Sequence, residues 1–189
     1  MKQVYHSALR DELDVNKELD YFTDGNNIVF RYDICKGFHQ YGDSCDLLYS
    51  EPSWEAGYKK FLDRAGKEQS VYKDYMNAVS DIVKQTSKPT WIILGKHAQK
   101  FFDLDRVESI VLHGYKTNVC GWNDNNDYKF GVSNYEFVQQ LSKRYNRMWD
   151  FSCGYGTAGM IFMKEGKNFV LSDINGKCVY YIAKQLGYK

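Results

Sequence analysis

The residues with the clearest potential for chemistry form a glycine-rich turn near the end of the sequence. Residues 150–159 read DFSCGYGTAG, and Asp173 follows nineteen residues after Gly154. Glycines let the backbone approach a ligand closely, and the first turn of a helix offers free amide groups. A carboxylate at the end of the next strand can accept hydrogen bonds from two ribose hydroxyls. The pattern is typical of sites that bind a nucleotide or a nucleoside.

Three interpretations of this turn are open. It can hold the pyrophosphate of a dinucleotide, or it can hold the amino-acid end of S-adenosylmethionine while Asp173 holds the ribose. It can also be a tight strand-to-helix turn without a ligand. Dinucleotide enzymes normally place this unit early in the chain, whereas only thirty residues follow Gly159 here. The order therefore favours a methyltransferase over a nicotinamide enzyme.

Strands and helices must alternate to position this turn. Apolar runs predict strands at 27–32, 46–50, 90–95, 108–113, 148–151 and 168–173. Helical spacing predicts helices at 67–86, 134–145, 157–164 and 175–186, and a helical segment at 1–25. Residues 114–133 combine a strand with a polar loop. This alternation predicts a single α/β domain over residues 1–189, with a doubly wound, mostly parallel sheet.

A second motif lies in the front half of the chain, where residues 46–54 read DLLYSEPSW. The two motifs, in this order, resemble those of the permuted (β-type) DNA amino-methyltransferases, which use S-adenosylmethionine. In that family D-L-I-x-x-D-P-P-Y/W precedes D-P-F-x-G-S-G-T-T. The resemblance covers roughly residues 27–54 and 133–187. It implies a Rossmann-like methyltransferase fold in which the catalytic half precedes the cofactor half.

The resemblance also implies roles for individual residues. Glu51 would accept hydrogens of an exocyclic amine, Pro52 and Ser53 would form the turn, and Trp54 would stack on a flipped base. The methyl group would then pass directly, by proximity and orientation. The residues implied to bind the cofactor are Asp33, Asn134, Asp150, Phe151, Ser152, Cys153, Gly154, Gly156, Thr157, Asp173 and Ile174.

Three positions depart from the family pattern. Glu51 stands where the family has Asp, Asn or Ser, Ser53 replaces the second proline, and Ser152 replaces the phenylalanine. The expected function is methylation of an exocyclic amine of a nucleic-acid base, and adenine is expected in preference to cytosine. The alternative is a catalytically altered or inactive protein that binds the cofactor, needs a partner subunit, or acts on a substrate other than nucleic acid.

Charge gives no independent support for a nucleic-acid partner. The 189 residues carry 25 basic and 24 acidic side chains, whereas many duplex-binding proteins have a clear basic excess. A local basic face can coexist with a neutral total. A nucleic-acid partner, DNA in preference to RNA, is therefore expected only because of the resemblance. Residues 114–133 are the segment left for a small recognition loop, unless a homo-oligomer or a partner supplies recognition.

Composition excludes several other classes of protein. The five cysteines and four histidines have no paired spacing, so neither a disulfide framework nor a metal site is expected. No apolar run is long enough to cross a membrane. The first residues include early acids and no apolar stretch, so we expect no signal peptide and a cytoplasmic location. The short chain suits a phage-like origin.

Overall fold

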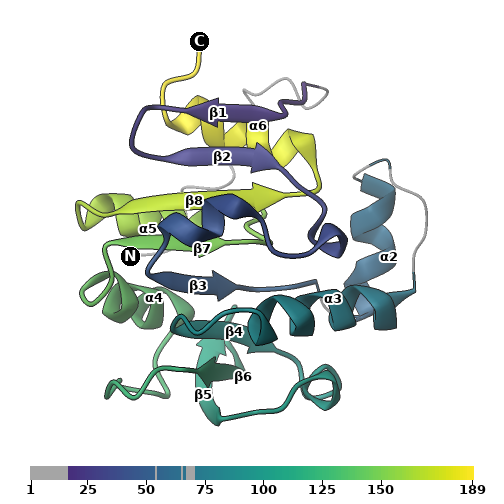
Figure 1. The fold of residues 1–189 in the computed structure, drawn as a ribbon, viewed down its shortest axis with the longest axis vertical. Coiled ribbons are helices and arrows are strands. Elements are labelled where there is room, and N and C mark those ends of the chain that lie inside the picture. The colour runs from purple at the N-terminus through teal and green to yellow at the C-terminus, as the bar shows by residue number, and fades with distance from the viewer. Residues whose placement is uncertain (1–16, 54, 65, 67–70) are drawn as a thin grey trace.

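A mixed sheet forms the centre of the computed structural model, which describes residues 17–53, 55–64, 66 and 71–189. The described residues form eight strands in the order β1-β2-β8-β7-β3-β4-β6-β5 (Figure 1). The strands are β1 (Tyr21–Thr23), β2 (Ile28–Arg31), β3 (Leu47–Ser50), β4 (Thr90–Leu94), β5 (Arg106–Leu112), β6 (Tyr115–Trp122), β7 (Arg147–Asp150) and β8 (Asn168–Asp173).

Five neighbouring strands of this sheet are parallel, and the remaining strands extend it at the two sides. β2, β8, β7, β3 and β4 pair in parallel, whereas β1 pairs with β2, and β6 with β4 and β5, in antiparallel fashion. The last strands of the chain, β7 and β8, therefore lie in the middle of the sheet. This arrangement confirms the predicted α/β class with a mostly parallel sheet.

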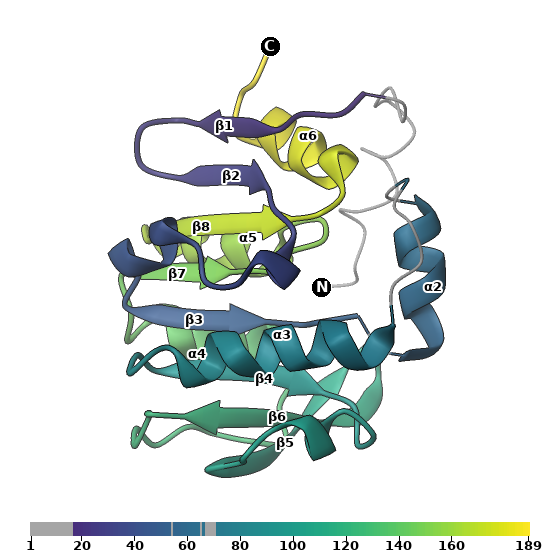
Figure 2. The same ribbon diagram turned by 45° about the vertical axis from the view of Figure 1, so that its right-hand side comes forward.

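Helices cover both faces. They are α2 (Glu55–Arg64), α3 (Tyr72–Lys84), α4 (Asn134–Ser142), α5 (Thr157–Lys164) and α6 (Gly176–Gln185), with short 3₁₀ helices η1 (Ile34–Lys36), η2 (Gln40–Ser44) and η3 (Gln99–Phe101). Figure 2 shows α3 in front of the sheet and α5 behind it.

Side chains that alternate along each strand supply a separate core to each face. Leu47 and Tyr49 of β3 pack in the cluster that contains α4, α5 and α6, whereas Leu48 packs in the cluster that contains α2 and α3. Both clusters consist of buried apolar residues, each of which contributes roughly 2 kcal/mol on burial. The two cores hold the strand ends in fixed register, which is what a site built on those ends requires.

Close packing fixes β6 against β4. A Cβ atom at Gly121 would lie 2.6 Å from the ring of Trp91, and Trp91 is fully buried. Only glycine lets the ring cover this strand. The antiparallel strand β6 therefore passes directly over a large core side chain.

The structure corrects the prediction of a helical segment at residues 1–25. Residues 1–16 of the predicted helical segment lie outside the described residues, but the remainder is not helical: it forms β1 and a turn. Asp24 Oδ1 accepts hydrogen bonds from the backbone N–H groups of Asn26 and Asn27, at 2.9 and 2.7 Å, which closes a hairpin onto β2. The strand predicted within residues 114–133 is confirmed as the eight-residue strand β6, whereas α2 was not predicted.

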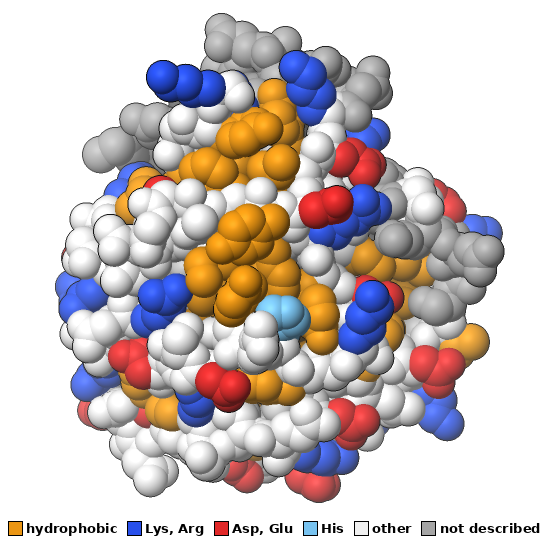
Figure 3. All heavy atoms as spheres, turned by 45° about the horizontal axis from the view of Figure 1, so that its top comes forward, with side chains coloured by type: hydrophobic (Ala, Val, Ile, Leu, Met, Phe, Trp, Pro, Cys, Tyr) orange, Lys and Arg blue, Asp and Glu red, His pale blue; other side chains and the backbone are white. Residues whose placement is uncertain are grey.

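The surface over β2 carries packed aromatic rings rather than a charged patch. The His39 ring lies 4.6 Å from Phe30, 4.7 Å from Tyr32 and 4.8 Å from Tyr41, between ring centroids. Figure 3 shows a histidine among hydrophobic side chains on this side of the molecule, with basic and acidic groups interspersed around them. Within the described ranges, no helix is long and apolar enough to span a membrane.

Candidate functional site

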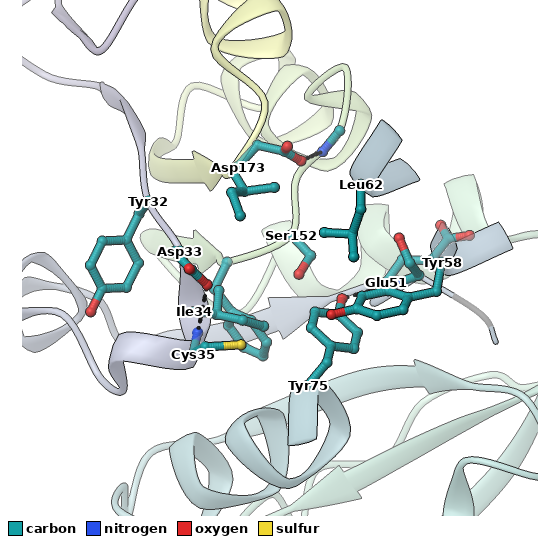
Figure 4. A pocket seen from close by; sticks show the side chains of 14 residues that line it. Tyr32, Asp33, Ile34, Cys35, Glu51, Tyr58, Leu62, Tyr75, Ser152 and Asp173 are labelled. Atoms are coloured by element: carbon teal, nitrogen blue, oxygen red, sulfur yellow. Dashed lines mark hydrogen bonds between the residues drawn. The ribbon is translucent and has the colours of Figure 1, made fainter. Parts of the chain in front are cut away.

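Four parallel strands end at the same edge of the sheet, and a cavity of about 520 Å³ opens there (Figure 4). The strands are β2, β8, β7 and β3. The cavity is lined by Tyr32, Asp33, Ile34, Cys35, Glu51, Ser53, Tyr58, Leu62, Tyr75, Phe151, Ser152, Gly154, Asp173 and Ile174. Ligands of open α/β sheets bind outside the carboxyl ends of the strands. The cavity therefore occupies the expected position for a ligand site.

Asp173 ends β8, and its buried carboxylate is held by two backbone groups. Oδ2 accepts the N–H of Gly154 at 2.8 Å, and Oδ1 accepts the N–H of Asn175 at 2.9 Å. Burial raises the pKa of Asp173 to about 6, although these hydrogen bonds oppose the shift. Each oxygen has a second lone pair. The carboxylate is thus fixed in place and can accept further donors from the cavity.

The glycines of the turn serve different purposes. Gly154 has φ +50°, lines the cavity, and has no heavy atom within 4 Å of where a Cβ would lie. A Cβ at Gly156 would instead lie 2.9 Å from Ile182, and one at Gly159 would lie 2.7 Å from Leu171. Gly154 therefore shapes the cavity wall, whereas Gly156 and Gly159 let α5 pack closely on β8 and α6.

Glu51 follows β3 and faces the same cavity from the other side. Burial raises the pKa of Glu51 to about 7 because the ionised form loses water. No lining residue that the structure describes is basic, so no cation offsets this burial. Near neutral pH the carboxyl group is therefore divided between its protonated and ionised forms.

Tyr75 connects the acidic turn to the glycine-rich turn. Its buried hydroxyl accepts the backbone N–H of Ser53 at 3.1 Å and is hydrogen-bonded to the side chain of Ser152. Figure 4 shows Tyr75 reaching up from α3 beneath Ser152, with Glu51 and Tyr58 beside it. Burial raises the pKa of the Tyr75 hydroxyl, which stays protonated. One side chain thus sets the spacing of the two turns.

The structure brings many of the predicted site residues to the cavity wall. Those that line it are Asp33, Glu51, Ser53, Phe151, Ser152, Gly154, Asp173 and Ile174. The predicted residues that do not line it are Pro52, Asn134, Asp150, Cys153, Gly156 and Thr157. Trp54 lies outside the described residues.

Two of the residues behind the wall have supporting roles. Asp150 is buried, and its Oδ1 accepts the N–H of Ser152 at 3.2 Å. Burial raises the pKa of Asp150 well above its usual range, with a further contribution from the charge of Glu51. Asn134 Oδ1 accepts the hydroxyl of Tyr49 at 2.9 Å. Both residues brace the site instead of facing its interior.

Six lining residues were not predicted: Tyr32, Ile34, Cys35, Tyr58, Leu62 and Tyr75. Tyr32, Ile34 and Cys35 flank Asp33, so its position could have indicated them. The helical spacing of α3 marks Tyr75 as buried but does not tell which ligand site its hydroxyl reaches.

The segment 114–133 is divided between the two edges of the sheet. Asn118 pairs with Leu94, near the carboxyl end of β4. Trp122 instead pairs with Thr90, at the amino end of β4, and its Nε1 donates to the carbonyl of Asp103 at 2.5 Å. Residues 122–128 thus lie at the edge opposite the cavity, and the recognition role expected of the segment 114–133 stays a prediction.

Comparison with known proteins identifies the fold. No family model and no curated protein matches the sequence. M1.HpyAVI matches in structure with a TM-score of 0.56 at 11% identity, over 85% of this chain and 98% of that one. Its SAM complex matches with a TM-score of 0.54 at 10% identity, over the same 85% and 98%.

TTHA0409 of Thermus thermophilus, provisionally described as a DNA modification methylase, gives a further match. Its complex with S-adenosyl-L-methionine matches with a TM-score of 0.52 at 10% identity, over 83% of this chain and 91% of that one. The chain therefore has the α/β fold that these structures share.

Proposed function

We propose that the protein is an S-adenosylmethionine-dependent methyltransferase that acts on an exocyclic amine of a nucleic-acid base, adenine before cytosine. One observation carries the proposal: Glu51 and Ser53 of the acidic turn line the same cavity as Gly154 and Asp173. A methyl donor and an amine can meet only if these segments face one another. Structures of this fold with the same cofactor add support.

The residues present fit this cofactor. The Asp173 carboxylate suits the ribose hydroxyls, and Asp33 lines the cavity one strand further along. Ile34, Phe151 and Ile174 supply apolar wall for a ring. The cavity size lies within the range of small-molecule sites, about 300–1,000 Å³. The described residues that line the cavity include acids and no basic residue, which suits a ligand with a cationic sulfonium and an ammonium group.

The chemistry required of the chain is modest. The cofactor would supply an electrophilic methyl group, and its sulfur would keep the electron pair of the broken sulfur–methyl bond as a neutral thioether. Ionised Glu51 accepts a hydrogen of the amine, which orients the nitrogen, and holds the proton that the amine releases as its new bond to carbon forms. A pKa near 7 suits this exchange because the carboxyl group can accept a proton and return it to water. Tyr75 keeps the acceptor and the cofactor turn at a fixed separation.

Transfer of a labelled methyl group to DNA and RNA tests the proposal. Wild-type protein is expected to label one of them, and Glu51→Ala is expected to abolish labelling without loss of cofactor binding. Asp105→Ala, which removes an exposed acid, is the matched control. Cofactor binding without transfer to any nucleic acid would contradict the proposal.

A second candidate follows from the departures at positions 51 and 53. A methyltransferase-like protein could bind the cofactor but require a second chain, or use an acceptor other than nucleic acid. It predicts no transfer to nucleic acid by the pure protein. Full activity of the isolated chain on DNA would exclude it.

A further inference from the structure

A second open cavity, of about 480 Å³, lies beside the acidic turn. It is lined by Glu55, Val71, Tyr72, Lys73, Lys100 and Phe101, and we refer to these residues as the lysine groove. They come from the beginnings of α2 and α3 and from η3, which follows β4. Figures 1 and 2 both show α2 beside the beginning of α3, near the end of β3. The lysine groove is thus at the same edge as the first cavity.

Three tyrosines separate the two cavities. Tyr58 and Tyr75 line the first cavity, and Tyr72 lines the lysine groove. The ring centroid of Tyr58 lies 5.4 Å from that of Tyr72 and 4.7 Å from that of Tyr75. A layer of packed tyrosine rings therefore separates the candidate amine site from the lysine groove.

The lysine groove differs from the first cavity in charge. The first cavity contains Asp33, Glu51 and Asp173 and no basic residue that the structure describes. The lysine groove has two exposed lysines and one acid, Glu55. Within the described part of the chain, neither Lys73 nor Lys100 has a carboxylate at ion-pair distance. Their charges are available to an anionic ligand.

Two aromatic rings line the groove together with these cations. Tyr72 and Phe101 have centroids 6.4 Å apart, and Lys100 Nζ lies 5.2 Å from the centroid of Phe101. Alternating cationic and aromatic groups are the pattern by which proteins bind single-stranded nucleic acid, through phosphates and stacked bases. An acidic polypeptide would match the lysines but has no need of two aromatic rings beside them.

We propose that the lysine groove holds the strand that flanks the target base, with Lys73 and Lys100 at phosphates and with Phe101 stacked on a neighbouring unpaired base. The proposal rests on the proposed function, since a base inserted at Glu51 leaves its neighbours outside the acidic cavity.

Fluorescence anisotropy of a labelled single-stranded DNA oligonucleotide tests this assignment. The double variant Lys73→Gln/Lys100→Gln is expected to bind about tenfold more weakly at low salt. Its slope of log K against log salt should fall by about 1.4, since two phosphate contacts are lost. The control, Lys84→Gln/Lys143→Gln, removes the same charge from exposed positions at the other edge and should bind like wild type.

Stacking is tested separately with Phe101→Leu, which keeps an apolar side chain in the partly buried position. Weaker oligonucleotide binding with an unchanged salt slope is expected, and the melting temperature reports whether the fold is retained. Poly-glutamate is the competing ligand. Equal affinity for poly-glutamate, or no change in Phe101→Leu, would overturn the proposal in favour of an acidic protein partner.

The outcomes separate this proposal from the proposed function. The wild type could transfer methyl groups while Lys73→Gln/Lys100→Gln binds the oligonucleotide as well as the wild type does. This result would contradict the role of the lysine groove and would leave the proposed function standing. Oligonucleotide binding that depends on Lys73 and Lys100, without any methyl transfer, would contradict the proposed function and would leave the proposal for the lysine groove standing. A wild-type protein that binds no oligonucleotide would overturn the lysine groove.

Discussion

The pKa values of buried acids are shifted in opposite directions at the two edges of the sheet. At the amino edge, Asp124 Oδ2 accepts Trp91 Nε1 at 2.6 Å, the Tyr128 hydroxyl at 2.7 Å and the Tyr145 hydroxyl at 2.8 Å. Asn126 donates to Oδ1 through its backbone and its side chain. Burial alone would raise the pKa of Asp124, but these donors outweigh it and the pKa is lowered.

At the carboxyl edge, burial outweighs the few hydrogen bonds that Asp150 and Asp173 accept. The pKa values of Glu51 and Asp173 are raised to about 7 and about 6 by burial, and burial also raises the pKa of Asp150 well above its usual range. A satisfied acid such as Asp124 stabilises the fold, whereas a buried acid with spare lone pairs costs stability until a ligand donates to it. The contrast distinguishes an edge built for packing from one built for binding.

Glu51→Gln should give the largest effect and should separate activity from stability. We expect methyl transfer to fall at least about 100-fold, because the neutral amide cannot take the proton of the amine. The folded pKa of about 7 exceeds the usual 4.5, so ionised Glu51 destabilises the fold increasingly between pH 4.5 and 7. The variant should therefore be more stable than the wild type at pH 8, by about 3 kcal/mol, and unchanged near pH 4.

Asp124→Asn, at the amino edge, should lower stability, whereas Glu51→Gln should raise it at pH 8. One donor amide would replace an acceptor oxygen among Trp91, Tyr128, Tyr145 and Asn126, so we expect the free energy of unfolding to fall by about 3 kcal/mol. Denaturant unfolding measures it, with Asp105→Asn at an exposed site as the control. If the variant were as stable as the wild type, the claim that the hydrogen bonds of Asp124 stabilise the amino edge would be contradicted.

Tyr75→Phe probes the connection between the two turns. The ring stays, but Ser53 N–H and the Ser152 side chain lose their common partner. We expect kcat to fall about tenfold, from a misplaced acceptor, with a stability loss of about 1 kcal/mol. Tyr135→Phe, at an exposed position, controls for loss of a hydroxyl. Unchanged kcat would show that the hydroxyl does not position the acidic turn.

The pH profile should give the smallest effect. Because protonated Glu51 cannot accept the amine hydrogen, kcat/KM should fall about fivefold between pH 7 and 6 and should level off above pH 8. Initial rates at constant ionic strength measure the profile. A profile that is flat between pH 6 and 8 would contradict the role given to Glu51.

Local patterns predicted most of the fold. The bounds of α5 and β8 agree with the prediction, because buried apolar runs and glycines define both. α2 was missed because EAGYKKFLDR lacks a clear apolar period, and β1 because three residues form a strand only by pairing with β2. The motifs indicated Glu51, Gly154 and Asp173, whereas Tyr58 and Tyr75 reach the cavity only through the packing of α2 and α3.

Binding of the methyl donor tests the central claim most directly. Calorimetric titration with S-adenosylmethionine should give saturable binding to the wild type and to Asp105→Ala, and loss of at least about tenfold in affinity in Asp173→Ala. No binding to the wild type, or equal affinity in Asp173→Ala, would contradict a cofactor site at the carboxyl edge.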